Sequence, residues 1–357
     1  MAGPPLAITP IDVAGAPEDE RRAAYALYEA DEREHFPGDR PPPYGEWLQE
    51  RTSTVSFRRN RLWIAATTAH HGRQAAADDE PVAYALAQDD LTNNTHLTWA
   101  WIYVSPAHRR RGIGRQLLAT LVDHARQHGR TSLLIDALEG CDHATAFLST
   151  YGLTPRIREH FNRLRVADID RALLEGWVAK ATERAAEYEL VGWDGPTPED
   201  RIERVTRLLE LMNTAPTEDL DWEDQRYTPE RVREREAELA ARGTTWWTLT
   251  AVHKPTGDPV GYTHLYFSKW RDELASQGGT AVDPAHRDKG IGRWLKAANL
   301  IRLLDERPTV ERVDTGNAGS NDAMLNINHA IGFRPIGVWI GYQNDVDVVA
   351  KHLEDAR

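Results

Sequence analysis

The sequence predicts a protein of the α/β class, in the α+β arrangement, built from two copies of one domain. Residues 106–117 read PAHRRRGIGRQL and residues 284–295 read PAHRDKGIGRWL, so nine of the twelve positions are identical. The copies are offset by 178 residues (287 − 109), half of the 357-residue chain. Each copy follows a strand-like segment and precedes a helix-like one. A glycine loop that recurs in the same context at this spacing indicates a duplicated domain with a repeated ligand site.

The first half of the chain opens with a strand and two helices and continues into three strands. The apolar, aromatic and β-branched residues of these three strands are typical of sheet. A polar, Asp-containing loop joins the first two of them as a hairpin. The expected segments are strand 6–14, helix 17–33, helix 46–51 and strands 61–68, 81–88 and 95–104.

The segments after the first glycine loop alternate between helix and strand. The residues Ile113, Leu117, Leu121, Val122 and Ala125 fall on one face of a helix, which marks the face that packs on the sheet. A buried-looking strand, a helix ended by glycine and a final strand follow. Their ranges are 132–138, 144–152 and 157–166.

The second half repeats this order. A charged amphipathic helix at 169–187 is the expected connector between two domains, 1–168 and 188–357. The expected segments are strand 188–193, helices 198–213 and 229–241, strands 244–253, 259–268 and 278–283, a helix to about residue 304, strand 310–315, helix 320–330 and strands to about residue 349.

Composition excludes several classes of protein. The single cysteine, Cys141, allows no intramolecular disulfide and no Cys/His zinc cluster, and the histidines show no HxxxH-type spacing on a convincing helix. No apolar run reaches the roughly 20 residues that span a bilayer, and the amino terminus lacks the features of a secretory signal. The net charge of −12 repels nucleic acid. We therefore expect a cytoplasmic protein with no metal and with neither a membrane nor a nucleic-acid partner.

The glycine loops have the residues of an anion site. Gly112 and Gly114, and likewise Gly290 and Gly292, allow a tight turn and a close approach of backbone to a ligand. The first-turn N–H groups of the following helix and its dipole then suit a pyrophosphate. The loops are not P-loops, because GxxxxGK[ST] is absent, and they do not follow the first strand of a βαβ unit as a Rossmann fingerprint does.

These motifs resemble those of the GCN5-related N-acetyltransferase (GNAT) family, in its tandem two-domain form. That family's pyrophosphate loop, R-x-x-G-x-G after a strand ending in V-x-P, stands here at 104–114 and again at 282–292. The order of elements is similar in both halves, and TGNAGSNDAMLNINHAIGF (315–333) resembles the family's N-x-x-[AMS]…GF signature. The resemblance covers nearly the whole chain. It implies two tandem GNAT folds, each a mixed, mostly antiparallel twisted sheet flanked by helices.

The resemblance also implies that the loops hold acetyl-CoA as the acyl donor. Asn321 could instead be an ordinary helix cap. Asp288 adds an unfavourable charge near a pyrophosphate unless its side chain faces solvent. The implied donor-binding residues are Tyr103, Val104, Arg109, Arg110, Arg111, Gly112, Ile113, Gly114 and Arg115 in the first half, and Ala281, Val282, Arg287, Asp288, Lys289, Gly290, Ile291, Gly292, Arg293, Asn317 and Asn321 in the second.

Three residues are the candidates for catalysis. Asn328 stands where members of the resembled family often carry a tyrosine acid. Asp283 and Glu223 are candidate bases; Glu223 belongs to an acidic run at 218–224 that could recruit a cationic amine or could be a solvated loop. The first half has the more basic loop, and the second half has the asparagines. We expect the chemistry in the second half and CoA binding in at least one.

The expected function is the transfer of an acetyl group from acetyl-CoA to a primary amine of a small molecule or peptide by direct attack, in a monomer or homodimer. The alternative is a CoA-binding sensor or scaffold without turnover. Asp288 inside the second loop and the missing tyrosine favour this alternative.

Overall fold

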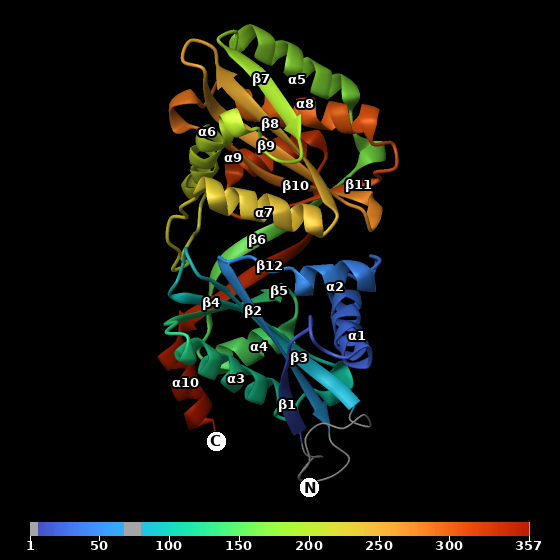
Figure 1. Cartoon of the computed structure of the whole chain (residues 1–357), viewed down its shortest axis with the longest axis vertical. Helices are drawn as coiled ribbons and strands as arrows, with labels where there is room; N and C mark the ends of the chain where they lie inside the picture. Colours follow the sequence, from blue (N-terminus) through green and yellow to red (C-terminus); the bar gives the residue numbers. More distant parts are fainter. Residues whose placement is uncertain (1–5, 68–79, 357) are drawn as a thin grey trace. The chain divides into compact units, whose positions relative to one another are not determined.

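The protein is described by a computed structural model that covers residues 6–67 and 80–356 (Figure 1). The chain forms two compact units that do not follow its order. Unit 1 comprises Met1–Arg156, Asp219–Glu223 and Ile340–Arg357, and unit 2 comprises Ile157–Glu218 and Asp224–Trp339. The polar loop expected between the first two hairpin strands lies outside the described residues. Each unit thus takes in a strand or part of a strand from the far half of the sequence.

Unit 1 is a mixed sheet with helices on both faces. Its strand order is β1-β2-β3-β4-β5-β12; the pairs from β1 to β4 are antiparallel, and β4 and β5 are parallel. The elements are β1 (Leu6–Ile11), α1 (Glu18–His35), α2 (Tyr44–Thr52), β2 (Arg58–Thr67), β3 (Glu80–Asp90), β4 (Leu97–Val104), a 3₁₀ turn η1 (Pro106–His108), α3 (Ile113–Gln127), β5 (Ser132–Leu138), α4 (Asp142–Thr150), the end of β12 (Arg334–Asp345) and α10 (Val346–Asp355).

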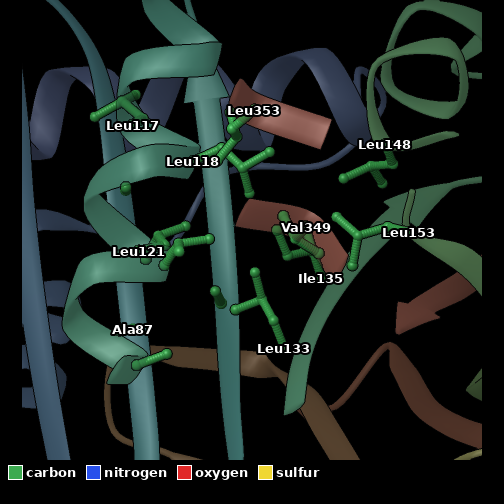
Figure 2. Packing of buried hydrophobic residues seen from close by; sticks show 14 of the residues in the cluster. Ala87, Leu117, Leu118, Leu121, Leu133, Ile135, Leu148, Leu153, Val349 and Leu353 are labelled. Carbon is green, nitrogen blue, oxygen red and sulfur yellow. The ribbon is translucent and has the colours of Figure 1, made fainter. Parts of the chain in front are cut away.

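Side-chain alternation divides the core of unit 1 between the two faces of its sheet. Leu62 and Ile64 of β2 pack with α1 and α2, whereas Trp63 and Ala65 of the same strand pack with α3, α4 and α10. Successive strand residues point to opposite faces, so one strand serves both layers. Figure 2 shows the second layer, where leucines of α3 meet side chains of β5, α4 and α10.

Unit 2 has the same architecture. Its strand order is β6-β11-β10-β9-β8-β7, antiparallel except for the parallel pair β10–β11. The elements are β6 (Thr154–Arg165), η2 (Val166–Asp168), α5 (Arg171–Arg184), β7 (Tyr188–Asp194), η3 (Glu199–Arg201), α6 (Ile202–Leu209), η4 (Glu210–Thr214), α7 (Pro229–Ala241), β8 (Thr244–His253), β9 (Asp258–Ser268), β10 (Arg271–Val282), η5 (Pro284–His286), α8 (Ile291–Glu306), β11 (Arg312–Ala318) and α9 (Asp322–Ile331). The expected class, two mixed and mostly antiparallel sheets flanked by helices, is confirmed.

One expectation is wrong at the carboxyl end of the chain. Strands were expected to about residue 349, but β12 ends at Asp345 and residues 346–355 form the helix α10. The valines of this segment suggest a strand by propensity. Their spacing decides otherwise, because Val346, Val349, Ala350 and Leu353 fall on one helical face and are buried in unit 1.

A core substitution tests the membership of β6 in unit 2. Leu164 comes from the first half of the chain but is fully buried among side chains of α5, α8 and β11. Leu164→Ala is expected to lower the free energy of unfolding by about 2–5 kcal/mol, because it leaves a cavity. Urea unfolding measures this loss. The exposed Ile336 supplies the control, since Ile336→Ala should change the free energy by less than about 0.5 kcal/mol; equal effects of the two substitutions would contradict the assignment.

Candidate active site

In each unit the two parallel strands separate before they end. The pairing of β4 with β5 stops at Ala100↔Ile135, although β4 continues to Val104. The pairing of β10 with β11 stops at Ser276↔Asp314, although β10 continues to Val282. Over the described residues, the last parts of β4 and β10 therefore pair only with β3 and β9. Each leaves one edge of backbone polar groups beside the glycine loop that follows.

The two glycine loops have the same backbone conformation. Gly112 (φ 81°) and Gly290 (φ 82°) are left-handed and precede the first residues of α3 and α8. Two positions earlier, Arg110 (φ 61°) and Asp288 (φ 65°) are also left-handed. Aspartate tolerates this region better than most residues, which gives a backbone reason for Asp288. Its side chain is exposed. Both loops thus end at the first turn of a helix, whose free N–H groups have the geometry that suits an anion.

The arginine that opens each loop holds the loop in place. Arg109 Nε donates to the carbonyl of Val104 at 2.9 Å, and Arg287 Nε donates to that of Val282 at 3.0 Å. Their Nη2 atoms reach the helical segments between the first and second strands of each unit's half of the sequence, α1 after β1 and η4 after β7: Arg109 pairs with Glu34 at 2.6 Å, and Arg287 donates to Thr214 at 2.7 Å. Because Glu34 neutralises Arg109, the positive charge at the first loop comes mainly from the exposed Arg110 and Arg111.

The other cations of the loops also have partners. Lys289 donates to the hydroxyl of Tyr188 at 2.7 Å, and this hydrogen bond raises the pKa of the lysine. Arg115 donates to the carbonyl of Leu353, and Arg293 lies over the ring of Trp177.

The apolar residues predicted to bind the donor are largely core residues. Burial, with Glu34 and Asp31 nearby, raises the pKa of Tyr103 to about 12, and this side chain packs in the layer of α1. Ile113 and Ile291 are buried under the first turns of α3 and α8. Ala281 and Val282 are half-buried at the end of β10. They support the loops through packing, and donor contact from these residues would come through their backbone.

The predicted catalytic residues are not brought together. Asp283 accepts a hydrogen bond from the Ala285 N–H at 2.8 Å and caps η5. Glu223 belongs to unit 1, where its N–H donates to Asn94 at 2.7 Å, at the end of β4 away from the glycine loop. Asn321 accepts from the Met324 N–H at 3.2 Å and so caps α9. These positions give no geometric support to Asp283 or Glu223 as a base.

Asn328 lies in a hydrogen-bonded chain of three side chains, two of them buried. Lys296 Nζ donates to Asn328 Oδ1 at 2.6 Å, and Asn328 Nδ2 donates to Asn317 Oδ1 at 2.7 Å. Lys296 is 1% exposed and Asn328 is fully buried. Burial lowers the pKa of Lys296 to about 7. Lys296 was not predicted, although the sequence carries a signal for it: it is a lysine on the apolar face of the helix, where the first copy has Leu118.

A buried carboxylate in unit 1 was also missed. Asp31 of α1 accepts hydrogen bonds from the Tyr84 hydroxyl and from Trp101 Nε1, and its carboxylate lies 2.7 Å from His35 Nδ1. Burial lowers the pKa of His35, but Asp31 outweighs it and the pKa is raised overall. Trp101 belongs to the part of β4 that has left β5. The sequence did not indicate this cluster, because Asp31 is one of many charged residues in the helix α1.

Comparison with known proteins agrees with this geometry. Residues 24–152 and 206–333 match the family described as Acetyltransferase (GNAT) family. A mycothiol acetyltransferase of Tsukamurella paurometabola is 27% identical over 64% of this chain and 72% of its own length. A mycothiol acetyltransferase of Rhodococcus erythropolis is 25% identical over 82% of this chain and 95% of its own.

Solved structures show the same fold. A tandem GNAT protein from the clavulanic acid biosynthesis pathway superimposes with a TM-score of 0.73 at 23% identity, over 96% of this chain and 99% of its own. A GCN5-related N-acetyltransferase from Sphaerobacter thermophilus superimposes with a TM-score of 0.64 at 16% identity, over 96% of both chains.

The repeated loop, the separated strands and the match over both halves define a tandem acetyltransferase. The chain belongs to the acetyltransferase (GNAT) family. It is an N-acetyltransferase by family, and that family uses acetyl-CoA. In the described ranges, no group of three or more His, Cys, Asp or Glu side chains could hold a metal ion. A search of the same residues found no helix that is both long and apolar enough to cross a bilayer.

Proposed function

We propose that the protein transfers an acetyl group from acetyl-CoA to a primary amine of a small molecule or peptide, and that unit 2 carries out the transfer. We further propose that two domains, 1–168 and 188–357, descend from one ancestor and are joined by residues 169–187. The protein would act in the cytoplasm as a monomer or homodimer. The glycine loop at the open end of β10 is the observation that carries the assignment to a donor site.

The backbone of β10 supplies a donor for a developing oxyanion. The Asp283 N–H is bonded to the Val260 carbonyl on β9. Since backbone N–H groups alternate sides along a strand, the Val282 N–H faces the opposite side, where β10 has left β11. A thioester carbonyl that follows the glycine loop into this region would meet that N–H. The same argument applies to Val104, because the Ser105 N–H is bonded to Val82. Such an N–H stabilises the tetrahedral intermediate of acyl transfer.

The reaction then requires a neutral amine and a leaving thiolate. A protonated alkylamine has a pKa of about 10, so its proton must be removed before the nitrogen attacks the thioester carbon. The carbon–sulfur bond then breaks and the sulfur leaves as a thiolate. The corresponding thiol has a pKa of about 8.5, so the thiolate can leave without a strong acid to protonate it. Holding the donor in line is therefore the main contribution of the loop and the strand edge.

Calorimetric titration with acetyl-CoA, followed by a thiol assay for CoA release, tests the proposal. We expect binding, and CoA release that depends on one class among amino sugars, amino acids, polyamines and peptide amino termini. Failure of the protein to bind acetyl-CoA at millimolar concentration would remove the proposed function.

A CoA-binding sensor without turnover is the second candidate. The side chains of two residues predicted to be catalytic have structural partners, because Asp283 caps η5 and Asn328 is bonded to Lys296. Glu223 is held through its backbone N–H, which donates to Asn94. Binding without CoA release for every amine class would favour the sensor.

A further inference from the structure

We propose that Lys296 is a positioning residue that fixes the direction of a hydrogen-bond chain ending in an amide N–H of Asn317, and that this N–H binds a carbonyl oxygen in the pantetheine or thioester part of the acyl donor. The inference rests on the proposed function, because it assigns a role at the same donor site.

The chemistry of the three side chains gives the chain one direction. In its protonated form, which predominates below the folded pKa of about 7, Lys296 can only donate, so the atom of Asn328 that faces Lys296 Nζ is the carbonyl oxygen Oδ1. The amide nitrogen of Asn328 must then face Asn317, and it donates to Asn317 Oδ1. With its oxygen occupied, Asn317 has its NH₂ group left for a further acceptor. A single ammonium thus determines which group the outermost amide offers.

The outermost amide lies where the two strands have separated. Asn317 is three residues beyond Asp314, the last residue of β11 that pairs with β10. It is half-buried, whereas Lys296 and Asn328 are buried. No other side chain in the described ranges accepts a hydrogen bond from Asn317 Nδ2. A ligand arm that runs along the open edge of β10 would pass this NH₂ group, which suits a neutral carbonyl acceptor.

The corresponding positions of unit 1 show that the fold does not require a polar chain. Lys296 is the sixth residue of α8, Asn328 the seventh of α9 and Asn317 the sixth of β11. The residues at these places in α3, α4 and β5 are Leu118, Leu148 and Ala137, and all three are buried in the core. Figure 2 shows Leu118 and Leu148 in that apolar layer.

Keeping the polar set in unit 2 carries a penalty. Burying an amine with one hydrogen-bond acceptor and an aromatic ring, that of Phe333, as its contacts is unfavourable compared with a leucine. The pKa of Lys296, lowered to about 7, reflects that penalty. Leucines, as in unit 1, would fill these positions without that penalty. We therefore assign the polar chain a role in binding the ligand.

Two ligands separate a role toward the donor arm from a role in folding. Acetyl-CoA carries the loop-binding phosphates and the carbonyl-bearing arm, whereas 3′-phospho-ADP carries the phosphates without the arm. All titrations are made below pH 7, where Lys296 is protonated, and in a Gly112→Val background that is designed to remove a donor site in unit 1. We expect Lys296→Met and Asn317→Asp each to weaken acetyl-CoA binding by about tenfold or more. Both variants should bind 3′-phospho-ADP within about twofold of the parent, because the glycine loop is unchanged.

Two further variants serve as controls. Leu118→Met places a methionine at the matching position of unit 1, and it should leave both affinities unchanged. Lys296→Leu combined with Asn328→Leu copies the side chains of unit 1; it should fold, as judged by thermal unfolding, and show the same selective loss.

The outcomes distinguish the two proposals. If the protein with both glycine loops intact does not bind acetyl-CoA, the proposed function fails. If that protein binds and the Gly112→Val parent does not, the donor site is not in unit 2, and the role of Lys296 is overturned. If the parent binds and the variants lose both ligands equally, or lose neither, the role of Lys296 is overturned.

Discussion

The Gly290→Val variant is expected to lose acetyl-CoA binding in unit 2. Gly290 has φ 82°, a left-handed conformation that a β-branched residue adopts only with strain. No atom lies within 4 Å of the place where a Cβ would be added, so the side chain would enter open space beside the first turn of α8. That space is where a phosphate must approach the backbone. Calorimetric titration should show one site fewer than the parent protein, or no site if unit 1 does not bind.

A matched glycine controls for strain. Gly257 in the turn between β8 and β9 also has a positive φ, 71°, and lies outside the glycine loop. Gly257→Val should reduce stability to a similar extent and leave acetyl-CoA binding intact. A comparable loss of binding in both variants would show that strain alone removes the ligand site. Gly112→Val performs the same test on unit 1.

The stability of the protein is expected to rise with pH between about 7 and 10.5 because of Lys296. Its pKa is about 7 in the folded protein and 10.5, the ordinary value of an exposed lysine, in the unfolded chain; burial in the folded protein causes the difference. Between these values the unfolded chain holds one more proton than the folded chain. Because unfolding takes up this proton, raising the pH disfavours unfolding and stabilises the folded protein. Within this range the free energy of unfolding rises by up to about 1.4 kcal/mol for each pH unit. Below the folded pKa and above the unfolded pKa, Lys296 no longer changes it.

Comparison with Lys296→Met isolates this contribution from other titrating groups. Methionine has no ionisable group. As pH rises from 7 to 10, the free energy of unfolding of the parent should therefore increase relative to that of the variant. Urea unfolding at several pH values measures it. A difference that stays constant across this range would show that Lys296 titrates normally, and that it is accessible to water.

The glycine loops were the part of the site that could be predicted best. Their function depends on backbone conformation and on the start of a helix, and both follow from a short run of residues. Gly112 and Gly290 have the expected role in the backbone. Arg109 and Arg287 were harder, because their partners Glu34 and Thr214 are 75 and 73 residues away in sequence. Nothing local tells a loop-bracing arginine from one that faces a phosphate.

The part of the fold that could not be predicted is the pairing of strands that are far apart in the sequence. The element order in both halves was expected correctly, apart from α10. The pattern of β6 predicts a strand but not its neighbour, which is β11 of the second half, with Leu164 opposite Val313. Glu223 likewise belongs to unit 1, where its backbone is hydrogen-bonded to the side chain of Asn94, and no local pattern indicates this contact. Such contacts depend on the whole chain.

The membership of β6 and of the end of β12 has an evolutionary consequence. A duplicated gene often loses the copy that is no longer needed. Here, deletion of the second half would remove Tyr342, Val349 and Leu353 from the core of unit 1, and deletion of the first would remove Leu164 from that of unit 2. A copy that stopped catalysing would therefore have to be kept. This constraint allows one half to diverge toward acceptor recognition or regulation while it continues to support its partner.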